Sequence, residues 1–400
     1  MRVLAVMFLC LVGLSASTSA IRTTAVPLPH DAYVWQRVWT PAVVAAASQS
    51  TDIVRTWRIL LAEGDRAGRW ATVAVPWDDV LATGRPVVGV IRIDGRLDED
   101  RMTAMLDRVV ATVSAPKTLR SIAGLEIDYD CPTSKLVTYA KFLSALRARL
   151  PASIALSITA LPTWLSSPAL GRLANDLSEV VLQVHAVDDP RRGLFDPEQA
   201  ERWVREFGRR LSRPFRVALP AYDVRVTWRS DGRLASVESE VPLLAGPGGE
   251  VLKARPEAVL GFLQALKRSA PAGLVGVVWF RLPTEADTRA WSLETWRAVV
   301  TDRLPPARVS ASLVPAEQPD LWNVVLSNDG TADTSLPTRI RLDRTCQAAD
   351  GANGFRLAVG GPADHRVLES NGSGRLRAKS KRTIGWARCV QPERELDVVD

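Results

Sequence analysis

The sequence predicts an α/β fold, a (β/α)8 TIM-like barrel that is followed by a small β-sandwich-like domain. Eight apolar, β-branched segments recur along most of the chain, and amphipathic helical patterns lie between several of them. Strands that are buried on both faces, as in a parallel barrel, are nearly continuously apolar. Their number favours a closed barrel over an open doubly wound sheet, since no glycine-rich phosphate-binding segment follows the first strand.

The expected strands and helices alternate along the chain. The strands are predicted at 32–39, 56–63, 87–94, 122–130, 153–161, 179–187, 215–223 and 273–283. Helical periodicity predicts helices at 98–113, 135–150, 196–211 and 255–269. Two connections depart from this alternation. Little helix follows the second strand, and a Ser-Asp-Gly-Arg turn between alternating runs predicts a hairpin inserted at about 224–254.

The chain divides into a barrel and a β-rich domain. The barrel is predicted to span 30–304, and the pattern changes at 301–311. Beyond this boundary, short alternating runs separated by turn residues predict a domain over 305–400. In an oxidising compartment, Cys346 and Cys389 could form a disulfide within this domain.

The N-terminus resembles an export signal. Arg2 precedes a short apolar run, and small residues follow up to Ala20. A secretory signal over 1–20 therefore predicts a secreted or periplasmic protein, with an uncleaved anchor as the alternative. No other segment is apolar enough to cross a bilayer, so no stable membrane span is expected after signal cleavage.

The net charge of +7 is mild and no basic helix carries interleaved aromatic residues, so no nucleic-acid partner is expected. The oligomeric state stays open.

Three carboxylates share one face of the fourth expected strand. Glu126, Asp128 and Asp130 occupy alternate positions, and neighbouring carboxylates are ~6–7 Å apart along the backbone. In a barrel, Asp130 would reach the C-terminal mouth, where such enzymes carry out their chemistry. A shared proton would keep one carboxyl protonated near neutral pH, as a general acid requires, so Glu126, Asp128 and Asp130 are the candidate catalytic residues. Alternatively, these acids pair with basic residues from other strands, in a network that could include Arg92 and Asp94.

The segment Ala-Gly-Leu-Glu-Ile-Asp-Tyr-Asp-Cys-Pro resembles the fourth-strand signature of the chitinase-type glycoside hydrolases of family eighteen, Asp-Gly-x-Asp-x-Asp-x-Glu. Gly124 and Asp128 match the glycine and the inner aspartate of that signature. Glu126 and Ala123 replace its two preceding aspartates, and Asp130 stands where the family has its acidic glutamate. The chain also resembles an uncharacterised bacterial family of secreted barrel proteins that is distantly grouped with glycoside hydrolases.

Three further segments resemble later strands of the same family. Val187-Asp188 stands where the sixth strand presents a Tyr-Asp pair. Pro220 and Tyr222 match a seventh-strand Pro-x-Tyr segment, and Trp279 matches the tryptophan that floors the sugar subsite. The resemblance implies a glycoside hydrolase-like protein that acts on a polysaccharide or glycan. It implies that Asp130 is the proton donor and Asp128 its electrostatic partner.

Other residues at the expected strand ends are candidates for sugar binding. Gln183 and His185 share a face, and the rings of Tyr222 and Trp279 could stack on a sugar, unless these residues belong to the core. Weaker candidates for the same site are Trp35, Glu63, Arg92, Asp94 and Asp223. Three scattered histidines do not form a zinc site, so neither a metal nor a cofactor is predicted.

Several functions remain open because Asp130 is one methylene shorter than the family's glutamate. This difference moves the proton ~1.5 Å back, and a misplacement of ~1 Å can cost about a hundredfold in rate. The site could therefore be rebuilt for another sugar, or it could belong to a non-catalytic carbohydrate-binding or envelope scaffold protein. A two-carboxylate hydrolase that uses Glu63 or Asp223 is a third possibility. In a fourth, the acids are buried ion pairs of a protein-interaction scaffold.

Overall fold

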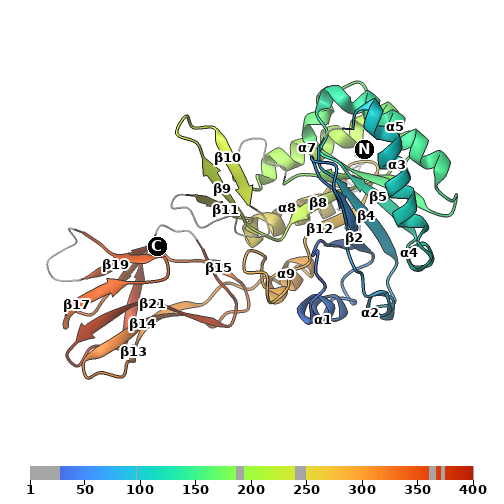
Figure 1. The fold of residues 1–400 in the computed structure, drawn as a ribbon. Coiled ribbons are helices and arrows are strands. Elements are labelled where there is room, and N and C mark those ends of the chain that lie inside the picture. The colour runs from blue at the N-terminus through green and yellow to red at the C-terminus, as the bar shows by residue number, and fades with distance from the viewer. Residues whose placement is uncertain are drawn as a thin grey trace, which may run out of the picture.

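Eight parallel strands close into a barrel in the computed structural model. The structure describes residues 28–95, 97–185, 193–238, 249–359, 366–370 and 374–399. The expected signal at 1–20 lies outside these residues. The barrel strands are β1 (His30–Val34), β2 (Trp57–Gly64), β4 (Val87–Ile93), β5 (Gly124–Asp128), β6 (Ala155–Ala160), β7 (Glu179–Gln183), β8 (Phe215–Pro220) and β12 (Leu274–Phe280). Each pairs in parallel with the next, and β12 pairs with β1 to complete the ring, which confirms the predicted barrel (Figure 1).

Each expected strand overlaps one of these strands, but several end earlier than predicted, and β1 begins two residues before the expected start. The expected strand at 122–130 leaves the sheet after Asp128, and the one at 179–187 leaves it after Gln183. Apolar character continues past these points because Tyr129, Cys131 and Val184 are buried in the main hydrophobic core, although they have left the ladder. We call the C-terminal ends of the strands the mouth and their N-terminal ends the floor.

Helices cover the outside of the barrel. They are α1 (Pro41–Gln49), α3 (Glu99–Ser114), α4 (Pro116–Ser121), α5 (Leu136–Arg149), α6 (Leu170–Leu173), α7 (Pro197–Arg210), α8 (Pro256–Arg268) and α9 (Leu293–Val300). The four predicted helices correspond to α3, α5, α7 and α8, within one residue at each end. The Asp196 side chain caps α7 by accepting hydrogen bonds from the Glu198 and Gln199 amides. No helix in the described part of the chain combines the length and apolar character that crossing a bilayer requires.

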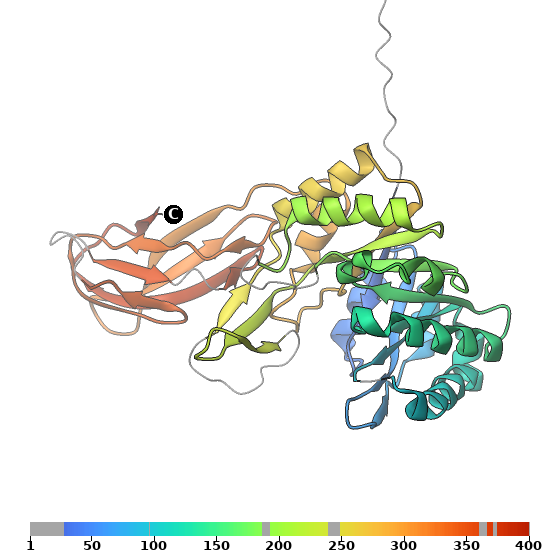
Figure 2. The same ribbon diagram turned by 90° about the horizontal axis from the view of Figure 1, so that it is seen from above.

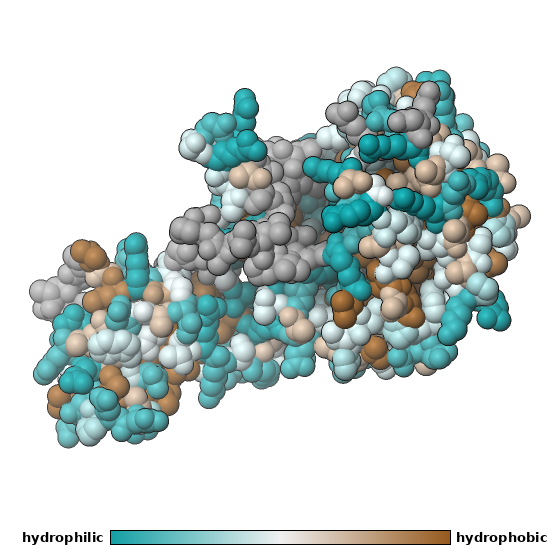
Figure 3. All heavy atoms as spheres, viewed as in Figure 1, coloured by the Kyte–Doolittle hydropathy of each residue, from teal (hydrophilic) through white to brown (hydrophobic). Residues whose placement is uncertain are grey.

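The second connection is short of helix, as the sequence indicates. The strand β3 (Trp70–Thr72) runs antiparallel beside β2, and only the six-residue α2 (Trp77–Ala82) follows it. A cavity of about 840 Å³ lies between α1 and residues 74–79. Apolar side chains gather on the surface over α1 and α2 (Figure 3).

An antiparallel ribbon interrupts the connection between β8 and β12. It consists of β9 (Val224–Trp228), β10 (Leu234–Glu238) and β11 (Glu250–Leu252), with β9 in the middle. The ribbon projects from the barrel, as Figures 1 and 2 show. Gly232 adopts a positive φ of 77° in the turn between β9 and β10, a conformation that glycine reaches without strain.

The C-terminal domain is an antiparallel sheet domain with a core of its own. Its strands are β13 (Val309–Pro315), β14 (Leu321–Asn328), β15 (Thr334–Ser335), β16 (Arg339–Arg341), β17 (Cys346–Gly351), β18 (Phe355–Leu357), β19 (Val367–Ser370), β20 (Arg375–Leu376), β21 (Ser380–Cys389) and β22 (Glu395–Val399). Eight of them form one sheet, and β15 and β20 form a separate two-stranded sheet. Buried residues such as Val324, Ile340 and Leu368 form the core.

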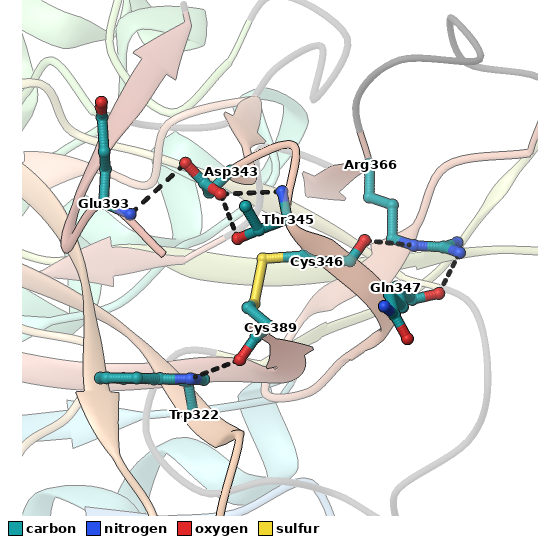
Figure 4. The surroundings of a disulfide bond; sticks show 8 residues. All are labelled: Trp322, Asp343, Thr345, Cys346, Gln347, Arg366, Cys389 and Glu393. Atoms are coloured by element: carbon teal, nitrogen blue, oxygen red, sulfur yellow. Dashed lines mark hydrogen bonds between the residues drawn. A yellow bond between two sulfur atoms is a disulfide. The ribbon is translucent and has the colours of Figure 1, made fainter. Parts of the chain in front are cut away.

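A disulfide joins Cys346 to Cys389 at neighbouring ends of β17 and β21, the pair that the sequence indicates (Figure 4). The Trp322 indole donates a hydrogen bond to the Cys389 carbonyl at 3.2 Å, so the bridge is embedded in the sheet. Cys131 is a buried free thiol in the barrel.

Charged residues fill the floor of the barrel. Arg58 is fully buried and forms ion pairs with Asp31, Glu126 and Glu179, which come from three other strands. Arg216 also pairs with Asp31 and Glu179, at 3.4 and 3.0 Å. Carboxylates in this low-dielectric position are stable only with such partners. The floor is therefore an ion-pair cluster inside an otherwise apolar barrel.

Substituting Arg58 by methionine is expected to lower the free energy of unfolding by about 3–5 kcal/mol, because three carboxylates lose their shared buried partner. Arg37→Met is the matched control. Arg37 is 47% exposed and pairs with Glu63, so its loss should cost at most about 1 kcal/mol. Urea unfolding followed by tryptophan fluorescence measures both effects. Equal destabilisation of the two variants would contradict the role given to Arg58.

Replacing Cys346 and Cys389 together by serine is expected to lower the stability of the C-terminal domain by about 2–4 kcal/mol, because the bridge closes a long loop in the unfolded chain. The two cysteines are 43 residues apart. Urea unfolding of this domain, followed by circular dichroism without reductant, measures the change. Adding reductant to the unsubstituted protein should reproduce it, and an unchanged midpoint in both cases would refute it.

Candidate functional site

Asp128 is a buried carboxylate at the mouth, fixed by three neighbouring strands. It accepts hydrogen bonds from Arg92 Nη1 of β4 at 2.6 Å and from Thr159 Oγ1 of β6 at 2.6 Å. Gln183 Nε2 of β7 approaches the same carboxylate at 3.4 Å. These contacts satisfy both oxygens, so Asp128 keeps one orientation and carries a fixed negative charge into the mouth.

Asp130 lies two residues further on, where the chain has left the sheet. Its side chain is 44% exposed, and Arg92 Nη2 lies 3.4 Å from its Oδ2. Burial raises the pKa of Asp130 to about 6, and the negative charge of Asp128 adds to the rise, while Arg92 opposes it. Asp130 is thus an accessible carboxyl that exchanges its proton near neutral pH, next to a carboxylate with a fixed position.

Glu126 belongs to the floor and not to the mouth. It is fully buried, accepts a 2.5 Å hydrogen bond from the Tyr33 hydroxyl and forms an ion pair with Arg58. Burial raises the pKa of Glu126, although Arg58 and Tyr33 oppose this. No face of this carboxylate is open to a substrate, so we assign it to the ion-pair cluster rather than to catalysis. Arg58 of β2 and Arg92 of β4 thus separate the three acids into two environments.

Phe280 is the centre of an aromatic wall in the mouth. Its ring centre lies 5.6 Å from that of His185, 5.3 Å from that of Tyr222 and 5.1 Å from that of Trp35. Tyr222 and Trp35 are almost completely buried, whereas Phe280 is half-buried. Phe280 therefore presents the open face of this wall.

Trp279 does not line the mouth, contrary to the expectation from the sequence. It is fully buried on the outer side of the barrel, against Trp291 and Trp296, and its indole donates to His30 Nδ1 at 3.1 Å. Successive side chains of a strand point to opposite faces, so a shift of one residue exchanges inside and outside. The inward aromatic residue is Phe280. Val278 faces the inside of the barrel, so the same alternation places Phe280, two residues further on, on the inner face.

His185 is a neutral, buried histidine beside this wall. Its Nδ1 lies 3.1 Å from the Ala218 carbonyl, a geometry in which Nδ1–H donates and Nε2 is left as an acceptor. Burial lowers the pKa of His185 to about 4, so the ring is uncharged at neutral pH. Burial also raises the pKa of Tyr222 above its ordinary value. Both rings therefore contribute neutral polar groups to the mouth.

Arg92 connects the acids to the aromatic wall. Its guanidinium lies 6.0 Å from the centre of the Trp35 ring, within the range of a cation–π contact. Glu63 is the register partner of Arg92 across β2 and β4, so it shares the inner face, where Arg37 holds it through hydrogen bonds of 2.5 and 2.7 Å. Asp94 is exposed and accepts a 3.1 Å hydrogen bond from Arg66.

Asp223 forms an ion pair with the C-terminal domain, outside the mouth. It is buried, and it accepts hydrogen bonds from Arg375 of the C-terminal domain at 2.6 Å and from the Ala254 amide at 3.1 Å. Burial raises the pKa of Asp223, while Arg375 opposes this rise. Asp223 is therefore held in an ion pair with the C-terminal domain and does not join the acids of the mouth. The expected Val187-Asp188 pair lies outside the described residues.

The structure thus brings together seven of the candidate residues. They are Trp35, Arg92, Asp128, Asp130, Gln183, His185 and Tyr222. Phe280 and Thr159 are functional candidates that the sequence did not single out. Among the residues that the structure describes, no group of three or more His, Cys, Asp or Glu side chains could hold a metal ion.

Solved structures with the same barrel include enzymes that act on glycans. The Bacillus cereus spore cortex-lytic enzyme SleL is 12% identical, with a TM-score of 0.51 that covers 70% of this chain and 74% of that one. A chitinase from Chromobacterium violaceum is 15% identical, with a TM-score of 0.50 that covers 70% of this chain and all of the other. At this identity the likeness establishes the glycoside hydrolase-like barrel fold and nothing further.

Sequence comparison places the chain in a family. No curated protein matches it. Residues 311–390 match a family described as a domain of unknown function, DUF8456. Residues 83–285, half of the chain and most of the barrel with β4 to β12, match a second such family, DUF3142. The protein therefore belongs to the DUF3142 family, whose barrel resembles that of the chitinases.

Proposed function

We propose that the protein binds a glycan at the barrel mouth and cleaves it, with Asp130 as the proton donor. The observation that carries this proposal is the pairing of an accessible Asp130 with a fully hydrogen-bonded Asp128. A general acid must be reachable and must be able to hold a proton near the working pH; Asp130 is 44% exposed and its pKa is raised to about 6, which supports this role. The same type of barrel in a chitinase and a spore cortex-lytic enzyme supports a polysaccharide ligand.

The other residues of the mouth have roles that follow from their contacts. Asp130 gives its proton to the leaving glycosidic oxygen, and water adds to the sugar carbon and returns a proton to Asp130. The fixed carboxylate of Asp128 stabilises the positive charge that develops at that carbon. Phe280 offers an apolar face for the CH groups of a sugar ring. His185 Nε2 accepts a hydrogen bond from a sugar hydroxyl. Secretion or periplasmic location is part of the proposal and is supported by the signal-like N-terminus and the disulfide.

A second function, glycan binding without turnover, is favoured by one observation. Arg92 contacts both Asp128 and Asp130, and a nearby cation favours the ionised form of an acid over the protonated form that a donor needs. The short side chain of Asp130 also limits its reach toward a bound sugar. The same mouth would then hold a glycan for attachment or envelope organisation.

Asp130→Asn is expected to reduce cleavage at least about a hundredfold while binding is retained, because the amide has no acidic proton to transfer. Asp107→Asn serves as the control, since Asp107 is exposed on α3 and pairs with Arg149. Chitin and peptidoglycan fragments are incubated with each protein, and the products are separated by mass spectrometry. Unchanged cleavage by Asp130→Asn would exclude Asp130 as the donor. Binding of fragments without any products from the unsubstituted protein would favour the second function.

Asp130 is expected to titrate near pH 6 rather than at its ordinary value of 3.8. Because the pKa is raised in the folded protein, the native state holds this proton more tightly than the unfolded chain. The contribution of Asp130 to stability is therefore full below about pH 4 and is lost as the pH rises through about 6. Asp128→Asn should lower the pKa of Asp130, and Arg92→Met should raise it. Carbon-13 NMR of labelled aspartates measures both shifts, and an Asp130 titration near 4 in the unsubstituted protein would contradict this arrangement.

A further inference from the structure

The C-terminal domain contacts the barrel through its small two-stranded sheet. Arg375 of β20 donates to the Asp223 carboxylate at 2.6 Å and approaches the Ala254 carbonyl at 3.4 Å. Both side chains of the ion pair are buried, with 8% and 7% of their surface exposed. Asp223 directly follows Tyr222 of the mouth. Arg375 of the C-terminal domain therefore links Asp223, just after β8, to Ala254, just after β11 of the inserted ribbon.

A second arginine of the same segment holds the connection after β12. Arg377 donates to the Glu285 carbonyl at 2.9 Å and to the Asp287 carbonyl. The Asp287 carboxylate in turn accepts hydrogen bonds from Arg281 Nε at 2.8 Å and from two backbone amides of its own turn. Asp287 thus shapes this connection, and Arg377 fixes the position of Asp287.

A buried aspartate next to β15 completes the contact. Asp333 is fully buried and accepts hydrogen bonds from the Ser292 amide at 2.6 Å and the Ser292 hydroxyl at 2.8 Å. Its own amide donates to Thr295 Oγ1 at 2.8 Å. Ser292 caps α9 of the barrel. Buried charges of this kind are stable only when both partners stay in place, so the two domains are joined in a fixed geometry.

The two connections that the arginines hold carry the aromatic wall. Arg281 follows Phe280 directly, and its guanidinium lies 5.7 Å from the centre of the Tyr222 ring. Tyr222 in turn lies 5.3 Å from Phe280 and 5.9 Å from His185. The wall of the mouth is therefore supported from behind by residues that the C-terminal domain holds.

We propose that Arg375 and Arg377 are positioning residues for the mouth and that the C-terminal domain is a fixed part of the site, not an independently moving module. The inference rests on the proposed function in one respect, because a change in the position of the aromatic wall is detected through the binding of a glycan. Without these arginines, the connections that carry Tyr222 and Phe280 lose their anchor and the wall shifts. The ring faces and polar groups that a bound glycan would contact then move out of place.

The test compares the full-length double variant Arg375→Ala, Arg377→Ala with Arg341→Ala. Arg341 belongs to the same domain but forms an exposed ion pair with Asp397, so it is a matched control. Calorimetry with the chitin or peptidoglycan fragment that the unsubstituted protein binds should show affinity at least about tenfold weaker for the double variant only. Hydrogen exchange should be faster at 221–223 and 281–291 and unchanged in β14 and β21. Arg377→Lys, which keeps the cation, should recover part of the affinity.

Each outcome decides the inference. Unchanged affinity and unchanged exchange in the double variant would overturn it, as would weaker binding without faster exchange in the two connections. If the unsubstituted protein binds no fragment, the proposed function fails, and the exchange data alone decide whether the arginines hold the connections. If the double variant does not fold, Arg377→Ala decides, because it leaves the Asp223–Arg375 pair intact.

Discussion

The inside of this barrel is organised by the need to neutralise carboxylates that have been removed from water. β5 and the residues just after it carry three acids on one face, and a low-dielectric interior does not tolerate uncompensated charges. Arg58 of β2 neutralises the deepest acid, and Arg92 of β4 neutralises the upper two. Because each arginine comes from a different strand, the charge balance exists only when the strands are in their native register. The acids therefore help to specify the barrel as well as its chemistry.

The two arginines differ in how far their partner carboxylates stay accessible to a ligand. Arg58 is enclosed by three carboxylates and belongs to a saturated cluster at the floor. Arg92 is shared between a buried Asp128 and a half-exposed Asp130, so the upper acid keeps a surface open to a ligand. This asymmetry separates the closed ion-pair cluster at the floor from the acids of the mouth, of which Asp130 is exposed. Acids of the one motif that resembles the glycoside hydrolase signature can therefore have two different roles.

The sequence predicted the barrel well because apolar runs and helical periodicity are local signals. It could not show where long-range partners lie. Glu126 was expected in catalysis because the approach of Arg58 depends on barrel closure, and Asp223 was a candidate because its partner Arg375 is 152 residues away. Trp279 was chosen over Phe280 because the facing of a strand changes with a single residue of register. Asp128 and Asp130 were found because their alternate positions, at the end of β5 and just beyond it, are a local signal in the sequence.

The pairing of β1 with β12 has a consequence for how the chain folds. His30 pairs with Val277, so the ring cannot close until nearly all of the barrel has been synthesised. Until then, β1 and the last completed strand are open edges with unpaired backbone groups, which other chains can join. Contacts between residues so distant in sequence also make folding slow. The unpaired edges of the nascent barrel are therefore exposed to aggregation for most of its synthesis. Pairing of β12 with β1 and β8 then covers both edges at once.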